Sequence, residues 1–192
     1  NTPIKIILID DGSQEVPAEE VLRGVSFADN IDLSVYKVTK DIGFNSHGCR
    51  NLGAMLANTE WLLFLDIDYT IQPSELRRLQ KEELDPLKLY EINARYKGRG
   101  EPYVALNQFV ISKKLFVESE GYDESWVPFH FGDREFLDEV MEAFDMGIEI
   151  AKPITYKYVK GSWGNKILLL QFSMLLLSNL TSSLKSSNSI LL

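Results

Sequence analysis

Five apolar residues, Trp61 to Leu65, lead directly into two aspartates, Asp66 and Asp68. A short, wholly apolar run of this kind is typical of a strand that is buried on both faces of a sheet. Such a strand needs helices above and below the sheet, so this stretch predicts an α/β protein. The chain has 192 residues, which is enough for one domain with a sizeable core.

The rest of the chain alternates between strand-like and helix-like segments. Apolar and β-branched runs predict strands at 4–9, 33–38, 61–65, 89–96, 104–112 and 148–151. Helical periodicity and turn residues predict helices at 17–30, 46–59, 73–84 and 133–147. This order predicts a three-layer α/β sandwich around a mostly parallel mixed sheet. Ligands of such sheets bind beyond the carboxyl ends of the strands.

The composition changes at Gly161, after which Leu, Ser and Asn dominate without a clean helical or strand period. We therefore expect residues 1–160 to form the α/β domain and residues 161–192 to form a tail of unknown structure. An amphipathic tail, a disordered tail and a misread end of the gene all fit this composition. Its most apolar run, residues 167–177, has about half of the roughly 20 residues that span a bilayer.

Charge and cysteine content exclude some classes of function. The formal net charge is −8, and an acidic chain lacks the excess of Lys and Arg that binding to nucleic-acid phosphates requires. We therefore expect no nucleic-acid partner. Cys49 is the single cysteine, so the chain has no internal disulfide and no cysteine-based zinc site.

The two aspartates after the apolar run, Asp66 and Asp68, point to a metal site. In an extended backbone, residues i and i+2 point to the same side. Two carboxylates on one side make a hard oxygen site that suits Mg²⁺ or Mn²⁺. An ion held there can bind a diphosphate and stabilise the charge that builds up as it leaves. The plainer alternative is that both residues only end a strand and cap a turn.

Several segments occur in a characteristic order. These are "IDDGS" at 9–13, "DIGFNSHGCRNLGAMLA" at 41–57 and "LFLDID" at 63–68. This set resembles family 2 of the GT-A nucleotide-sugar glycosyltransferases. The segment at 107–140, with G-Y-D-E and an acidic residue before a helix, resembles the acceptor half of that fold. It is also similar to the carboxyl-terminal region of the galactosyltransferase group. The resemblance covers residues 4–147.

The resemblance implies a GT-A fold and an inverting, metal-dependent sugar transfer with Mg²⁺ or Mn²⁺. The donor would be a UDP-, GDP- or dTDP-sugar, and the acceptor a hydroxyl of a glycan or another molecule. Asp10 and Asp11 would hold the nucleobase and ribose, with Arg50 near the base or the phosphates. Asp66 and Asp68 would hold the metal and the diphosphate.

On the acceptor side, the resemblance implies that Asp133 is the general base that deprotonates the acceptor hydroxyl. An acid at the start of a helix is also favourable on dipole grounds alone, so Asp133 would stabilise its helix as well. The acceptor pocket would be shaped by four consecutive residues: Gly121, Tyr122, Asp123 and Glu124.

The sequence departs from the family pattern in several places, including Asp41 and Cys49 of the helix motif, where Asn and Ala are usual. The family's first strand, which normally precedes the "DDGS" strand, is absent, so we expect either an amino-terminally truncated chain or a sheet that lacks one central strand. Gly132 precedes Asp133 where the family usually has a second acid. By resemblance alone, we expect a cytoplasmic protein that makes peripheral contact with the inner membrane face and acts in polysaccharide biosynthesis.

Two other interpretations remain open at this point. "LFLDIDYT" also fits the first motif of haloacid-dehalogenase-like phosphatases, with Asp66 as nucleophile and Asp68 as general acid/base. That interpretation leaves "DDGS" and "RNLGAMLA" unexplained. The third interpretation is a non-catalytic remnant or a carbohydrate-binding module.

Overall fold

A computed structural model describes residues 3–67, 71, 73–94, 103–127, 132–144, 149–150 and 170–177. The strands are β1 (Ile4–Asp10), β2 (Ile31–Lys37), β3 (Trp61–Phe64), β4 (Leu89–Ala94), β5 (Tyr103–Ser112), β6 (Glu149–Ile150) and β7 (Leu170–Leu177). The helices are α1 (Ala18–Leu22), α2 (Ser46–Leu56), α3 (Pro73–Leu79), α4 (Lys113–Glu118), the 3₁₀ turn η1 (Glu124–Trp126) and α5 (Gly132–Phe144).

The described strands form one mixed sheet in the order β2-β1-β7-β3-β5-β4-β6. β1 and β2 pair in parallel, as do β4 and β6, whereas β5 and β7 are antiparallel to both of their neighbours. It follows that β1, β2, β3, β4 and β6 all run in one direction and β5 and β7 in the other. The sheet is mixed, as predicted, but only two of the six described pairings are parallel, because β5 and β7 each lie between strands of the opposite direction. The carboxyl ends of β1 and β3 therefore lie at the same edge.

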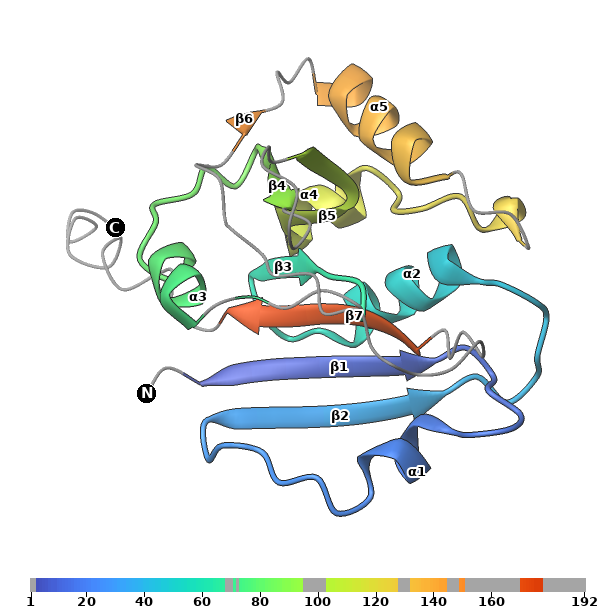
Figure 1. Ribbon diagram of the computed structural model, residues 1–192. Coiled ribbons are helices and arrows are strands. Elements are labelled where there is room, and N and C mark those ends of the chain that lie inside the picture. Colours follow the sequence, from blue (N-terminus) through green and yellow to red (C-terminus); the bar gives the residue numbers. More distant parts are fainter. Residues whose placement is uncertain are drawn as a thin grey trace, which may run out of the picture.

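The strand β7 lies in the centre of the sheet, between β1 and β3 (Figure 1). Its register pairs Ile4 with Leu177 on one side and Leu62 with Leu176 on the other. These residues belong to the segment that the sequence analysis assigned to a tail of unknown structure. The same analysis expected either a truncated chain or a sheet that lacks one central strand; among the described strands, β7 holds a central position, antiparallel to both neighbours.

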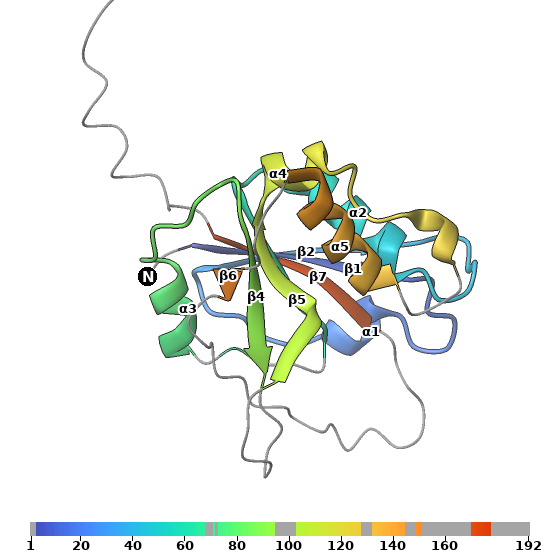
Figure 2. The same ribbon diagram turned by 90° about the horizontal axis from the view of Figure 1, so that it is seen from above.

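Helices cover both faces of the sheet, with α2, α4 and α5 on one side and α1 and α3 on the other (Figure 2). The alternation along β3 explains the two cores, because successive side chains point to opposite faces. Phe64 packs with Phe109 and Phe136 under α5, whereas Trp61 packs with Leu79 of α3 on the opposite face. This is the predicted three-layer α/β sandwich.

Helix lengths differ from the sequence prediction most at the first helix. The pattern predicted a helix over 17–30, but α1 ends at Leu22. Gly24 follows with a positive φ of 79°, a conformation that glycine adopts without strain and that ends a helix. Among the helices that the structure describes, none has the length and apolar character needed to cross a membrane.

Candidate functional site

The first aspartate pair lies at the carboxyl end of β1, whose last residue is Asp10. The side chain of Asp10 holds the loop after that strand through hydrogen bonds. Its side chain is buried, with one oxygen accepting a hydrogen bond from the Ser13 amide (2.7 Å) and the other from the Ala18 amide at the start of α1 (2.8 Å). Asp10, which we predicted to bind the nucleotide, therefore fixes the turn that carries Asp11.

Asp11 is half-buried and joins the same loop to α2. Its Oδ2 atom accepts a hydrogen bond from the Asn45 amide at 2.6 Å, and Asn45 in turn caps α2 through its side chain. Burial raises the pKa of Asp11, and the nearby Asp41 and Asp10 add to that shift. Gly12, with a φ of 82°, allows the close approach of Asp41, because a Cβ at position 12 would lie 3.2 Å from the Asp41 Cα atom.

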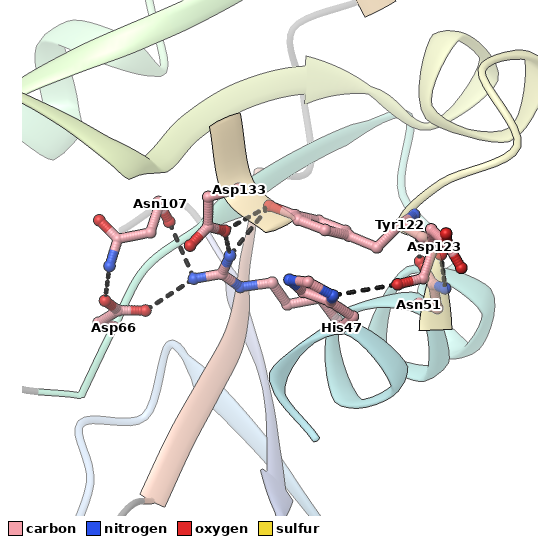
Figure 3. Close-up of polar contacts among 8 residues, drawn as sticks. His47, Asn51, Asp66, Asn107, Tyr122, Asp123 and Asp133 are labelled. Atoms are coloured by element: carbon pink, nitrogen blue, oxygen red, sulfur yellow. Dashed lines mark hydrogen bonds and ion pairs between the residues drawn. The ribbon is translucent and has the colours of Figure 1, made fainter. Parts of the chain in front are cut away.

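Arg50 forms ion pairs with two carboxylates, Asp66 and Asp133, which Figure 3 shows in a second cluster with Tyr122 and Asn107. Its side chain extends from α2 and is almost completely buried. One terminal nitrogen, Nη2, donates to Asp66 Oδ1 at 2.8 Å, and the other, Nη1, donates to Asp133 Oδ1. One guanidinium thus connects the residue after β3 with the start of α5, which are the two places predicted to bind donor and acceptor.

The surroundings of Arg50 favour its charged form. Burial alone would lower the pKa of Arg50, but Tyr122, Asp133 and Asp66 together raise it above its ordinary value. The sequence analysis placed Arg50 near the base or the phosphates of a donor. The structure places it between two of the other predicted site residues.

Asp66 is further fixed from β5. Asn107 Nδ2 donates to Asp66 Oδ2, and the Asn107 carbonyl accepts from Arg50 Nη2 at 3.2 Å. The antiparallel register of β3 and β5, in which Phe64 faces Phe109, brings Asn107 opposite Asp66. The carboxylate of Asp66 therefore has a defined orientation at the carboxyl end of β3.

Asp133 is fixed by a second donor, Tyr122. The Tyr122 hydroxyl accepts from Arg50 Nη1 at 2.9 Å and donates to Asp133 Oδ1 at 3.1 Å. Burial raises the pKa of Tyr122 well above its usual value, which keeps the phenol protonated and able to donate. Both bonds described for Asp133 go to Oδ1.

The predicted acceptor loop, residues 121–124, is held against α2 by Asn51. Its side chain accepts from the Tyr122 amide (2.9 Å) and donates to the Tyr122 carbonyl (2.8 Å) and to Glu124 Oε1 (2.9 Å). Asp123 is exposed, and hydrogen bonds from the backbone and hydroxyl of Ser125 lower the pKa of its carboxyl. The loop thus presents two exposed acids, Asp123 and Glu124, close to α2.

Gly121 allows this loop to approach α2. Its φ is 71°, and a Cβ there would meet Asn51 Oδ1 at 2.7 Å.

We expect Gly121→Ala to lower the free energy of unfolding by about 1–2 kcal/mol for the left-handed backbone, and by about 1–3 kcal/mol more for the clash. Urea denaturation measures both. Gly24→Ala is the matched control, because Gly24 has a φ of 79° and open space around it; an equal loss in both variants would contradict the proposed clash.

Asp66 is the predicted metal ligand that the structure describes. Asp68 lies outside the described residues, and the part of the chain that the structure describes contains no group of three or more His, Cys, Asp or Glu side chains able to hold an ion. Asp66 suits Mg²⁺ or Mn²⁺ in chemistry, since both ions prefer hard carboxylate oxygens. The predicted ligands therefore fit such an ion in kind.

The structure brings together Arg50, Asp66, Tyr122 and Asp133, which were predicted as separate parts of a donor and an acceptor site. The bonds described for Asp10 and Asp11 belong to the neighbouring loop and to the start of α2. Sequence reasoning missed Asn51, Asn107 and His47. Asn51 stands beside Arg50 in the quoted helix motif, and Asn107 could have been found from the register of β3 and β5.

Comparison with known proteins identifies the family of the chain. No curated protein matches the chain. The family model described as "Glycosyl transferase family 2" matches residues 1–139, which include Arg50, Asp66, Tyr122 and Asp133. This match favours glycosyl transfer over the phosphatase interpretation of Asp66, and it implies a nucleotide-sugar donor and an acceptor in general terms. With its GT-A α/β fold, the chain belongs to glycosyl transferase family 2.

Proposed function

We propose that this chain moves a hexose from a UDP-, GDP- or dTDP-sugar to an acceptor hydroxyl, with inversion at the anomeric carbon. The observation that carries the proposal is the Arg50 bridge, which holds Asp66 and Asp133 on two nitrogens of one guanidinium. Asp66 stands at the strand end, where ligands of α/β sheets bind. Asp133 stands across from it, where a base can face the acceptor.

The chemistry follows from these positions. The acceptor oxygen attacks the anomeric carbon while the bond from that carbon to the diphosphate oxygen breaks, and the diphosphate leaves with the electron pair. The acceptor proton passes to Asp133 Oδ2, because Oδ1 already accepts from Arg50 and Tyr122. Tyr122 and Arg50 thus orient the base, and the exposed acids Asp123 and Glu124 line the acceptor side.

On the donor side, Asp10 and Asp11 would hold the nucleoside, and Asp66 with Asp68 would hold Mg²⁺ or Mn²⁺. When bound, the ion would neutralise charge on the leaving diphosphate. Arg50 and Asn107 fix the orientation of the Asp66 carboxylate. The carboxylate would therefore need little reorganisation to bind the ion when the donor arrives.

A thermal-melt panel tests the donor half of the proposal. We would melt the chain with Mn²⁺ and each of UDP, GDP and dTDP. A ligand at about 100 times its dissociation constant stabilises by about 2.7 kcal/mol, which raises the melting temperature of a domain of this size by about 5–10 °C. We expect such a rise with one nucleotide, dependent on Mn²⁺.

Two variants sharpen this panel. Asp66→Asn keeps an oxygen for the Arg50 bond but loses the charge, and we expect it to abolish the nucleotide-induced rise. Asp85→Asn, at a surface turn where Asp85 accepts from the Leu87 amide, should leave the rise intact. A cooperative melt that no nucleotide shifts would contradict the proposal and favour the non-catalytic remnant.

A further inference from the structure

His47 is a buried polar residue that the proposed mechanism does not use. It lies in the first turn of α2 and is only 2% exposed. Its ring stacks on the Tyr122 ring, with 4.9 Å between centroids and an interplanar angle of 21°. Figure 3 shows the two rings side by side, with one imidazole nitrogen directed at Asp123.

The hydrogen bond to Asp123 fixes the tautomer of His47. Nδ1 lies 3.1 Å from the Asp123 carbonyl oxygen, which can only accept, so Nδ1 carries the proton and donates. Burial lowers the pKa of His47, which keeps the ring neutral. Nε2 is then an acceptor, and it is buried without a partner among the described residues.

The edge of the His47 ring that carries Nε2 also contacts the start of α5. A Cβ added at Gly132 would lie 1.9 Å from His47 Cε1 and 2.6 Å from Nε2. The imidazole therefore occupies the space that a side chain at position 132 would need. Gly132 is the residue immediately before Asp133, so His47 bears directly on the backbone that carries the proposed base.

We propose that His47 is a positioning residue that sets the place of Asp133 through two contacts. One contact is with the backbone at Gly132, and the other is with Tyr122, whose hydroxyl donates to Asp133 Oδ1. The Nδ1 hydrogen bond to the acceptor loop holds the ring in this position. The inference rests on the proposed role of Asp133 and adds a residue, His47, and a requirement for glycine at position 132.

Two substitutions separate the nitrogens of His47. Asparagine places an amide N–H near Nδ1 and keeps the bond to the Asp123 carbonyl, whereas glutamine places its polar end near Nε2. The assay is release of nucleoside diphosphate from UDP-, GDP- and dTDP-hexoses, with Mn²⁺ and p-nitrophenyl hexosides as acceptors. We expect His47→Gln to lower kcat about tenfold or more, as misplacement of a reacting group does, with an unchanged KM for the donor. His47→Asn should lower kcat to a similar extent, because it keeps the bond to the Asp123 carbonyl but loses the ring that contacts Gly132 and stacks on Tyr122 (order-of-magnitude estimates).

A second pair of variants tests the contact with Gly132 even if a single variant is unstable. Gly132→Ala should lower kcat about tenfold or more because its Cβ displaces His47. In the His47→Ala background, where the space is open, the same Gly132→Ala change should cost little further. Additive effects of the two changes would overturn the inference, as would a kcat within about threefold of the wild type in His47→Asn or His47→Gln.

These outcomes distinguish the two proposals. A wild-type chain that transfers no hexose from any donor contradicts the proposed function, and the role of His47 falls with it. If the wild type transfers a hexose but His47→Gln and Gly132→Ala transfer it at the same rate, the positioning role of His47 is contradicted and the proposed function stands.

Discussion

Replacing Arg50 by methionine is expected to lower the free energy of unfolding by about 3 kcal/mol or more. Removing one partner of a buried ion pair costs about 3–5 kcal/mol because it leaves charge without compensation. In this chain it leaves two carboxylates, Asp66 and Asp133, which are 24% and 21% exposed. That partial exposure places the expected cost at the lower end of the range. Urea denaturation followed by tryptophan fluorescence measures it.

The chain contains a matched control for this change. Arg78 on α3 also contacts two carboxylates, those of Glu75 and Glu82, but its side chain is 34% exposed. Exposed ion pairs contribute about 0–1 kcal/mol, so Arg78→Met should change stability by less than about 1 kcal/mol. Similar losses of unfolding free energy in Arg50→Met and Arg78→Met would contradict a special contribution of the buried Arg50 ion pairs. Arg50→Met should also abolish transfer, since it releases both proposed site carboxylates.

Asp133→Asn is expected to lower kcat for transfer by about 10²–10⁴-fold, which is the usual contribution of a general base. The amide oxygen still accepts from Arg50 and Tyr122, so the fold and the donor site should persist. The melting shift produced by the donor nucleotide with Mn²⁺ should therefore match that of the wild type. Release of nucleoside diphosphate, measured with and without acceptor, gives the change in kcat.

Asp138→Asn controls for loss of charge on the same helix. Asp138 forms an exposed ion pair with Arg134, one turn away from Asp133, and takes no part in the cluster around Arg50. We expect its kcat to stay within about twofold of the wild type, since exposed pairs contribute little. Transfer by Asp133→Asn at the rate of Asp138→Asn would mean that another group removes the acceptor proton.

The fold could be predicted from the sequence because its signals are local. Short apolar runs predict the buried strands β1 and β3, and a periodic apolar stripe predicts α5. Each of these patterns lies within a few consecutive residues. Asp66 and Asp133 were found in the same way, one at the end of an apolar strand and the other at the start of an amphipathic helix. The α/β sandwich follows from the order of these segments.

Features that depend on distant pairing could not be predicted. The strand β7 pairs with β1 across more than 160 residues of sequence, and its run of leucines carries no period that distinguishes strand from helix. The contact between His47 and Gly132 joins α2 to α5, and neither residue indicates the other in the sequence. Arg50 was expected beside a ligand, but its ion pairs with Asp66 and Asp133 appear only once β3, α2 and α5 are assembled.

The most direct test of the account is the configuration of the product. The chain would be incubated with Mn²⁺, an α-linked nucleotide-hexose and an acceptor glycoside. The signal of the anomeric proton in the proton NMR spectrum would then give the configuration of the first-formed product. Direct displacement assisted by Asp133 predicts a β-linked product, with inversion. An α-linked product would contradict Asp133 as the base of a single displacement.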